Sequence, residues 1–168
     1  MTEDQFWKII DESKRNDDGS HEIQAKAVQL MECLLKLDLD EIVAFNQIFI
    51  DLLRKSYTWD LWGAAYIIDG GVSDDDFEYF RRGLIAAGRE KFENALRDPQ
   101  SLADWIEPDE TEYEIILYAV YDAYREKSGQ DEIPDIQPNY PSRPTGEEWG
   151  EDNDDLKIRY PKLWAKFA

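Results

Sequence analysis

The sequence predicts an all-α fold, because helical periodicity and helix-capping residues recur along most of the chain. Apolar residues recur at spacings of three and four over residues 23–35 and again over 42–53, which is typical of amphipathic helices. No period-two alternation lasts long enough to indicate a β-strand. We therefore expect a single-domain helical bundle of about six to eight helices over residues 1–128, with an extended C-terminal arm.

Three pairs of residues predict capping boxes. In a capping box the side chain of the first residue accepts the backbone N–H of the fourth, and the side chain of the fourth accepts the backbone N–H of the first. The pairs are Thr2 with Gln5, Asp38 with Glu41, and Ser73 with Asp76. Thr58 is a further N-cap candidate. The helix after it is expected to end at Gly70-Gly71, because glycine tolerates the left-handed backbone conformation. Asp98-Pro99 is expected to end another helix, and Gly129 to close a last one from about residue 110.

Residues 129–168 differ in composition and are expected to form an arm that packs on the helical domain. Four prolines at positions 134, 138, 141 and 144 favour an extended segment without regular structure. Trp149 and Trp164 are expected to dock the arm, since tryptophans are rare in disordered segments. The alternative is a disordered tail.

The chain is strongly acidic, with 38 acidic and 19 basic residues and a net charge of −19. The excess is global, because acids outnumber bases two to one both in residues 1–84 and in residues 85–168. Such a field repels nucleic acids and anionic membranes and steers basic proteins toward the surface. The alternative is that the charge only keeps a small protein soluble.

The compartment predicted for the chain is the cytoplasm. The start MTEDQFWKII has neither the basic nor the apolar region of a signal peptide, and no apolar run approaches the ~20 residues that span a bilayer. The single cysteine, Cys33, follows the apolar pattern of a helix, so packing is its expected role.

Aromatic residues dominate the segment from 57 to 89. Trp59, Trp62 and Tyr66 are spaced three and four apart, so they lie on one side of a helix, where Gly63 permits close approach by a neighbour. One interpretation is a core contact with the following helix. The other is a groove closed by Tyr79 and by basic side chains. The candidate binding residues are Trp59, Asp60, Trp62, Tyr66, Tyr79, Arg81, Arg82 and Arg89.

The three arginines in this set have two interpretations. They form a basic cluster that could meet an anion, or they pair with Asp60, Asp69 and the acids at 74–76. The acids at 74–76 are also expected to favour a helix N-terminus.

No catalytic residue, metal ligand or cofactor is predicted. The single histidine, His21, lies in a polar segment without a second catalytic element nearby. The run at 152–155 lacks the central glycine and final glutamate of a calcium loop, and phosphate-binding glycine motifs are absent.

A dense acidic run in the arm is the candidate surface for a basic partner. Its residues are Glu147, Glu148, Glu151, Asp152, Asp154 and Asp155. We expect no helix cap to need these carboxylates, which leaves them all available for recognition.

The chain resembles the DUF4240 family, a bacterial domain of unknown function. The resemblance rests on FWKIID at 6–11, on DLWGAAY at 60–66 and on GGVSDD at 70–75, and it covers about residues 1–128. Val72 and Gly83 depart from the expected pattern, where a small residue such as cysteine and a bulky residue would stand. The resemblance implies a fold unit and carries over no catalytic residues.

Two classes of function are open at this point. The first is a non-catalytic, cytoplasmic protein-binding module that docks a basic partner, in the manner of immunity proteins and antitoxins, with a DNA-mimicking inhibitor as a variant. The second is a small-molecule-binding protein or enzyme that uses the aromatic groove at Trp59 and Trp62, with Asp60 or Glu78 as acid or base.

Overall fold

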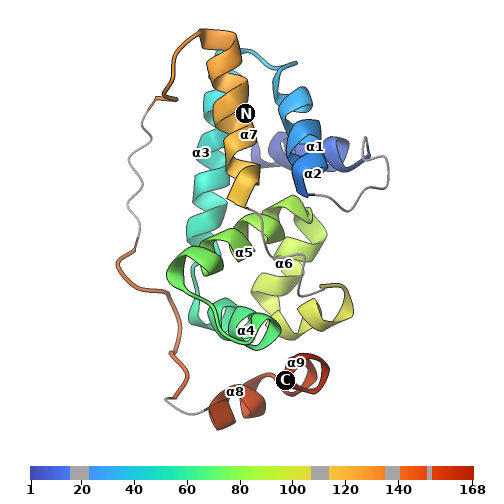
Figure 1. Cartoon of the computed structure of the whole chain (residues 1–168), viewed down its shortest axis with the longest axis vertical. Helices are drawn as coiled ribbons and strands as arrows, with labels where there is room; N and C mark the ends of the chain where they lie inside the picture. The colour runs from blue at the N-terminus through green and yellow to red at the C-terminus, as the bar shows by residue number, and fades with distance from the viewer. Residues whose placement is uncertain (16–22, 107–113, 135–140, 151–152) are drawn as a thin grey trace. The chain divides into compact units, whose positions relative to one another are not determined.

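The structure is a computed structural model that describes residues 1–15, 23–106, 114–134, 141–150 and 153–168 (Figure 1). Over these residues the regular elements are all helices, which confirms the predicted all-α fold. The one β-type pairing found there is an isolated parallel bridge between Thr58 and Thr145. Within the same ranges, none of the helices is long and apolar enough to span a membrane.

Residues 1–128 hold seven described α-helices and one 3₁₀-helix, within the range that the sequence predicts, and two short helices follow. They are α1 (Glu3–Arg15), α2 (Ile23–Leu34), α3 (Leu39–Lys55), α4 (Trp59–Asp69), α5 (Asp74–Ala86), α6 (Arg89–Arg97), η1 (Pro99–Asp104), α7 (Glu114–Ser128), α8 (Asn153–Arg159) and α9 (Pro161–Phe167).

All three predicted capping boxes are present. The N-cap side chains accept the backbone N–H of the residue three positions later, at 3.2 Å for Thr2 and Gln5, 2.8 Å for Asp38 and Glu41, and 3.2 Å for Ser73 and Asp76. In each pair the side chain of the later residue accepts the backbone N–H of the N-cap residue. Thr58 caps α4 by accepting the Leu61 N–H at 3.2 Å, and Gly70 follows α4 in the left-handed conformation. These local signals therefore place the helix starts correctly.

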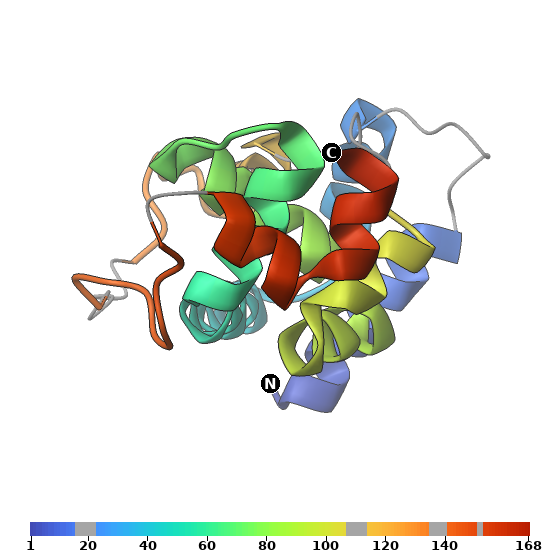
Figure 2. The same cartoon turned by 90° about the horizontal axis from the view of Figure 1, so that it is seen from below.

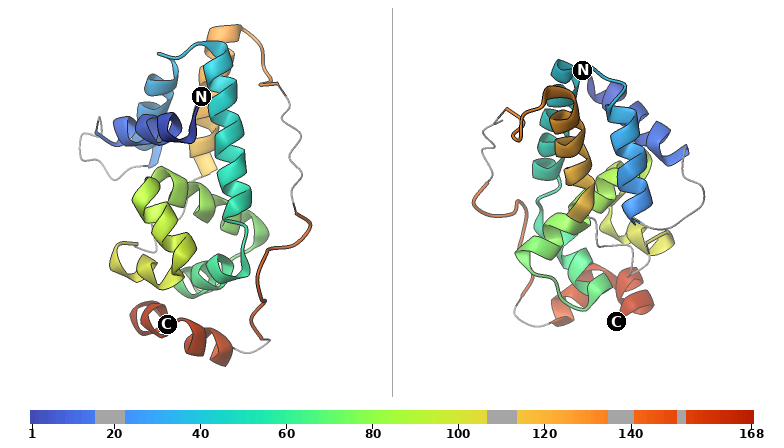
Figure 3. Two further views of the ribbon diagram at one scale, coloured as in Figure 1. Left: turned by 180° about the vertical axis from the view of Figure 1, so that it is seen from behind. Right: turned by 45° about the horizontal axis from the view of Figure 1, so that its top comes forward.

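Contacts divide the chain into two compact units, Met1–Leu52 with Tyr113–Asn139, and Leu53–Glu112 with Tyr140–Ala168. In the first unit, α1 and α7 both pack on α2 (Figure 3). Phe6 is fully buried and stacks on Phe45 at 4.4 Å between ring centroids. Cys33 is buried, and this burial raises the pKa of its thiol, as expected for a packing role.

In the second unit, α5 packs on α4 and α6, while α9 packs on α4 and η1 (Figure 2). Its core is built from apolar side chains of every helix in the unit. They include Leu61, Phe77, Phe80, Leu84, Phe92, Leu102, Leu156 and Leu163. The predicted boundary between a domain at 1–128 and an arm at 129–168 stays a prediction.

The predicted arm at 129–168 is less extended than the sequence indicates. Residues 141–150 contain no helix, but α8 and α9 follow. Asp154 and Asp155 lie in the first turn of α8 and Arg159 in its last, as the helix dipole favours, and Pro161 begins α9 at a position where proline is tolerated. Burial of Leu156 and Leu163 holds α8 and α9 against the other helices of the second unit.

Gly70→Ala is expected to lower the free energy of unfolding by about 1 kcal/mol, because a side chain at φ 69° is strained although the added Cβ would meet no atom within 4 Å. Gly150→Ala is the matched control, since Gly150 is not among the glycines with positive φ and its added Cβ would lie 3.9 Å from the nearest atom. Urea unfolding followed by far-UV circular dichroism compares the two. Equal midpoints would contradict the capping role of Gly70.

Candidate functional site

The aromatic residues of α4 form the centre of the candidate site. Trp59 and Trp62 stack with ring centroids 5.4 Å apart and planes 18° apart. Trp62 also stacks on Phe77 of α5 at 4.8 Å and 19°. Phe77 is fully buried, whereas both tryptophans are only partly buried. Trp62 therefore makes the contact between α4 and α5 that the core interpretation expects.

A third tryptophan, which lies far away in the sequence, covers this side of α4. Trp149 meets Trp59 edge to face at 5.5 Å and 83°, and meets Tyr66 at 5.8 Å. A Cβ added to Gly63 would lie 3.5 Å from the Trp149 ring. We call Trp59, Gly63 and Tyr66 the α4 face. Trp149 occupies that face, so the predicted groove is filled by the chain itself.

Leu156 of α8 and Tyr160, which lies between α8 and α9, approach the same glycine still more closely. The added Cβ at Gly63 would lie 2.9 Å from Leu156 Cδ2 and 3.2 Å from Tyr160 Cε2. At these distances a side chain at position 63 would require the Leu156 and Tyr160 side chains to shift. Gly63 thus permits the close approach that the sequence predicts, and the neighbour is the C-terminal region.

Residues 141–150, here called the strap, are also held by main-chain bonds. Trp59 donates its N–H to the Thr145 carbonyl at 2.9 Å, and Thr145 donates its N–H to the Tyr57 carbonyl at 3.1 Å. These two bonds form the parallel bridge at the start of α4. The strap is therefore fixed at Thr145 by backbone and at Trp149 by an aromatic ring.

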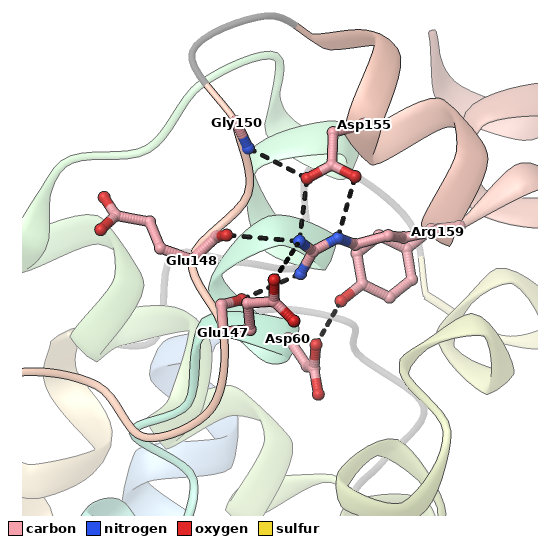
Figure 4. Close-up of polar contacts among 7 residues, drawn as sticks. Asp60, Glu147, Glu148, Gly150, Asp155 and Arg159 are labelled. Atoms are coloured by element: carbon pink, nitrogen blue, oxygen red, sulfur yellow. Dashed lines mark hydrogen bonds and ion pairs between the residues drawn. The ribbon is translucent and has the colours of Figure 1, made fainter.

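Arg159 of α8 fastens the strap to its own helix (Figure 4). Its guanidinium donates to the carbonyl oxygens of Glu147 and Glu148 at 2.9 and 3.3 Å, and to Asp155 Oδ1 at 3.1 Å. Asp155 also accepts the Gly150 N–H at 2.9 Å. This amide bond and the Arg159 guanidinium lower the pKa of the Asp155 carboxyl, while the bond to Asp155 raises the pKa of Arg159.

Asp60, proposed above as an acid or base, is engaged in a structural bond. The Tyr160 hydroxyl donates to Asp60 Oδ1 at 2.6 Å. Burial and the neighbouring carboxylate both raise the pKa of Tyr160, so the phenol keeps its proton. Asp60 therefore joins α4 to Tyr160, which lies between α8 and α9.

The candidate arginines do not gather around the α4 face. Arg81 is buried, donates to the Leu53 and Phe77 carbonyls at 2.7 and 3.3 Å, and lies 4.8 Å from the ring centroids of Tyr57 and Phe77. It therefore joins the end of α3 to α5.

Arg82 and Arg89 each bond to an acid on their own helix. Arg82 donates to Glu78 at 2.5 Å and lies 5.2 Å from the ring centroid of Tyr79. Arg89 donates to Glu93 at 2.7 Å. Pairs of this kind, four residues apart, support a helix and do not by themselves indicate an anion site.

The acidic surface residues differ in what they do. Glu147 forms an ion pair with Arg159 at 3.9 Å although its side chain is 89% exposed, and Asp154 is exposed as well. Glu148 lies 3.3 Å from Arg143 in an exposed pair. The expectation that no carboxylate of this set serves the fold is wrong for Asp155, which bonds Gly150 and Arg159. Glu151 and Asp152 lie outside the described residues, as does His21.

Nothing in the described ranges assembles three or more histidine, cysteine or acidic side chains into a potential metal site. The run at 152–155 is described only from Asn153 onward.

The sequence did not reveal the structural roles of Arg159 and Tyr160. The spacing of Leu156, Tyr160 and Leu163, by four and then three, was the signal for a buried helical side there.

A protein-family model described as "Protein of unknown function (DUF4240)" matches residues 1–126. The chain belongs to this family. No curated protein and no solved structure matches it. The matched residues include the α4 face but end before Trp149, Leu156 and Tyr160, which cover it.

Trp62→Ala is expected to lower the free energy of unfolding by about 2–3 kcal/mol, less than the ~3–5 kcal/mol of a fully buried ring, because Trp62 is partly exposed. Trp62→Phe keeps a ring against Phe77 and is expected to lose less. Thermal and urea unfolding measure both variants. A Trp62→Ala protein with unchanged stability and a lost ligand would favour the groove interpretation.

Asp155 makes strap docking sensitive to acid. Its pKa is lower in the folded chain than in the unfolded chain, so its contribution is present above about pH 4 and is lost as the pH falls below that value. Fluorine NMR of protein labelled with 5-fluorotryptophan is expected to show the Trp149 resonance shifting over this acid range. Asp155→Asn is expected to shift it already at neutral pH.

The Trp105 resonance serves as the control for that titration, because Trp105 stacks with Lys91 in a different part of the second unit. A Trp149 resonance that moves only together with Trp105 would report global unfolding. That result would remove the local role of Asp155.

Proposed function

We propose that the chain is a non-catalytic, cytoplasmic protein-binding module that docks a basic protein through its acidic surface, as immunity proteins and antitoxins do. The observation that carries the proposal is the way in which the strap presents charge. Arg159 bonds the backbone carbonyls of Glu147 and Glu148, while the Glu147 carboxylate lies 3.9 Å from Arg159 on a side chain that is 89% exposed (Figure 4).

A fixed backbone under exposed carboxylates suits electrostatic recognition. The segment loses little further conformational freedom on binding, so less of the interaction energy is spent on ordering it. The net charge of −19 adds a long-range field that speeds encounter with a basic protein.

The alternative use of the α4 face for a small molecule has less support. Trp149 covers the face, Leu156 and Tyr160 crowd Gly63, and Asp60 accepts a bond from Tyr160. A small molecule would have to displace these contacts before it reached Trp59. One of the two carboxylate oxygens of Asp60, Oδ1, already accepts the 2.6 Å bond from Tyr160.

The test starts from a basic protein captured on the purified chain from extracts of its source cells at low salt and identified by mass spectrometry. Its association rate is then measured on wild type and on the triple variant Glu147→Gln, Glu148→Gln, Asp154→Asn. We expect the variant to associate about 3- to 10-fold more slowly at low salt, and the difference to shrink as salt screens the charges. Asp155 is left unchanged because it serves the fold.

The matched control is Glu32→Gln, Glu126→Gln, Glu132→Gln, which removes the same charge from exposed positions of the first unit. We expect this control to slow association less than the triple variant of Glu147, Glu148 and Asp154 does. Equal rates for the two triple variants would show that the strap has no special role. An association rate that does not depend on salt would leave the charge with solubility alone.

A further inference from the structure

The strap contacts α4 in the way in which a bound peptide contacts a recognition domain. Backbone bonds at Thr145 resemble strand addition, where main-chain pairing gives affinity and a side-chain anchor gives specificity. The anchor here is Trp149, four residues later. Two separate kinds of contact thus select an extended backbone and an aromatic side chain.

The residues between these two contacts face solvent. Gly146, Glu147 and Glu148 are exposed, and Thr145 itself is exposed although its backbone is paired. The side chain of Trp149 therefore supplies the strap's aromatic contact with α4. A segment of different sequence with the same backbone pairing and a tryptophan at the same spacing would make equivalent contacts.

The acceptor on α4 is formed without help from the strap. Trp59 is held by stacking on Trp62, and Trp62 by stacking on the fully buried Phe77. Thr58 caps the helix and so fixes the backbone at the pairing position. The backbone N–H of Trp59 and the carbonyl of Tyr57 point to the strap from this rigid start. Little reorganisation is needed to exchange one occupant for another.

We propose that Tyr57–Tyr66 is a peptide-recognition surface that the chain's own strap occupies in the free protein. The partner that it fits is an extended segment of another protein, with a tryptophan four residues after the residue that pairs with Tyr57 and Trp59. Such a segment replaces Thr145 and Trp149 at their positions. The proposal does not rest on the acidic surface, because it uses backbone bonds and ring contacts only.

The strap has the advantage of being part of the same chain. Tethering gives it an effective concentration on the order of millimolar, and the Arg159 bonds add to its hold. An external peptide therefore competes poorly with the intact strap. Removing the Trp149 ring from the full-length chain weakens this competition, because only the Thr145 backbone bonds and the Arg159 bonds still hold the strap, and it leaves Trp59, Gly63 and Tyr66 in place.

The experiment uses the full-length Trp149→Ala variant and a synthetic peptide of residues 142–150, SRPTGEEWG, with blocked ends and 5-fluorotryptophan. Fluorine NMR then observes only the peptide. We expect saturable binding to Trp149→Ala and about 10-fold weaker binding to wild type, which retains its own strap.

Two control peptides test the two kinds of contact. A peptide with alanine at the tryptophan position is followed by calorimetry and is expected not to bind. A peptide with proline at the Thr145 position lacks the N–H that donates to the Tyr57 carbonyl, so it is expected to bind several-fold more weakly. Binding that ignores both changes would overturn the proposal.

The full-length Arg159→Gln variant guards against misfolding of Trp149→Ala. It loosens the strap but keeps all aromatic side chains, and it is expected to take the peptide more tightly than wild type does. Absence of peptide binding to whichever variant circular dichroism shows to be folded would overturn the proposal. A wild-type dimer that disappears in Trp149→Ala would also overturn it, because a second copy of the chain would then be the occupant.

Discussion

The missing side chain at Gly63 is the constraint on which the C-terminal half of the second unit depends. The Leu156 and Tyr160 side chains lie so close to this glycine that both would have to shift to admit a Cβ. Leu156 is fully buried there, and Tyr160 reaches Asp60 from the same position. Trp149 then lies beside them on Trp59 and Tyr66. One backbone position on α4 thus makes room for an apolar contact, a hydrogen bond and an aromatic contact.

Arginine has a structural use in this acidic protein. Arg159 and Arg81 each donate to backbone carbonyls, and Arg81 does so while buried beside the rings of Tyr57 and Phe77. A guanidinium satisfies several acceptors at fixed angles, which lysine does not do. The cations therefore fix the positions of loops and helix ends. Acidic side chains such as Asp154 remain exposed, and acids outnumber bases two to one, so the negative field of the molecule is preserved.

The sequence predicted what depends on local contacts. The capping boxes at Thr2, Asp38 and Ser73 join residues three apart, so their pattern is sufficient to identify them. The sequence also indicated a close approach at Gly63. It did not reveal the partners, because Leu156 and Tyr160 lie more than ninety residues further along the chain and no local pattern encodes such a pairing.

The same limit explains the error at Asp155. A run of acids in a segment with prolines has the composition of a solvated arm, and composition cannot show that Arg159 follows four residues later on a helix. Arg81, Arg82 and Arg89 are close in sequence, but a buried carbonyl network and two helical acids separate their roles.

The family match ends before the strap begins. The matched residues 1–126 contain Trp59, Gly63 and Tyr66, while the residues that cover them all lie beyond the match. Without residues 141–168, the chain would expose stacked aromatic rings next to a bare helix backbone, and exposure of such an apolar surface to water is unfavourable. The α4 face therefore has to be covered. The strap supplies part of this cover through two backbone bonds at Thr145 and the Trp149 ring, and Arg159 and Asp155 hold the strap to α8. A surface that needs an occupant, together with strap contacts that another extended segment can reproduce, is the physical basis for exchange with a partner.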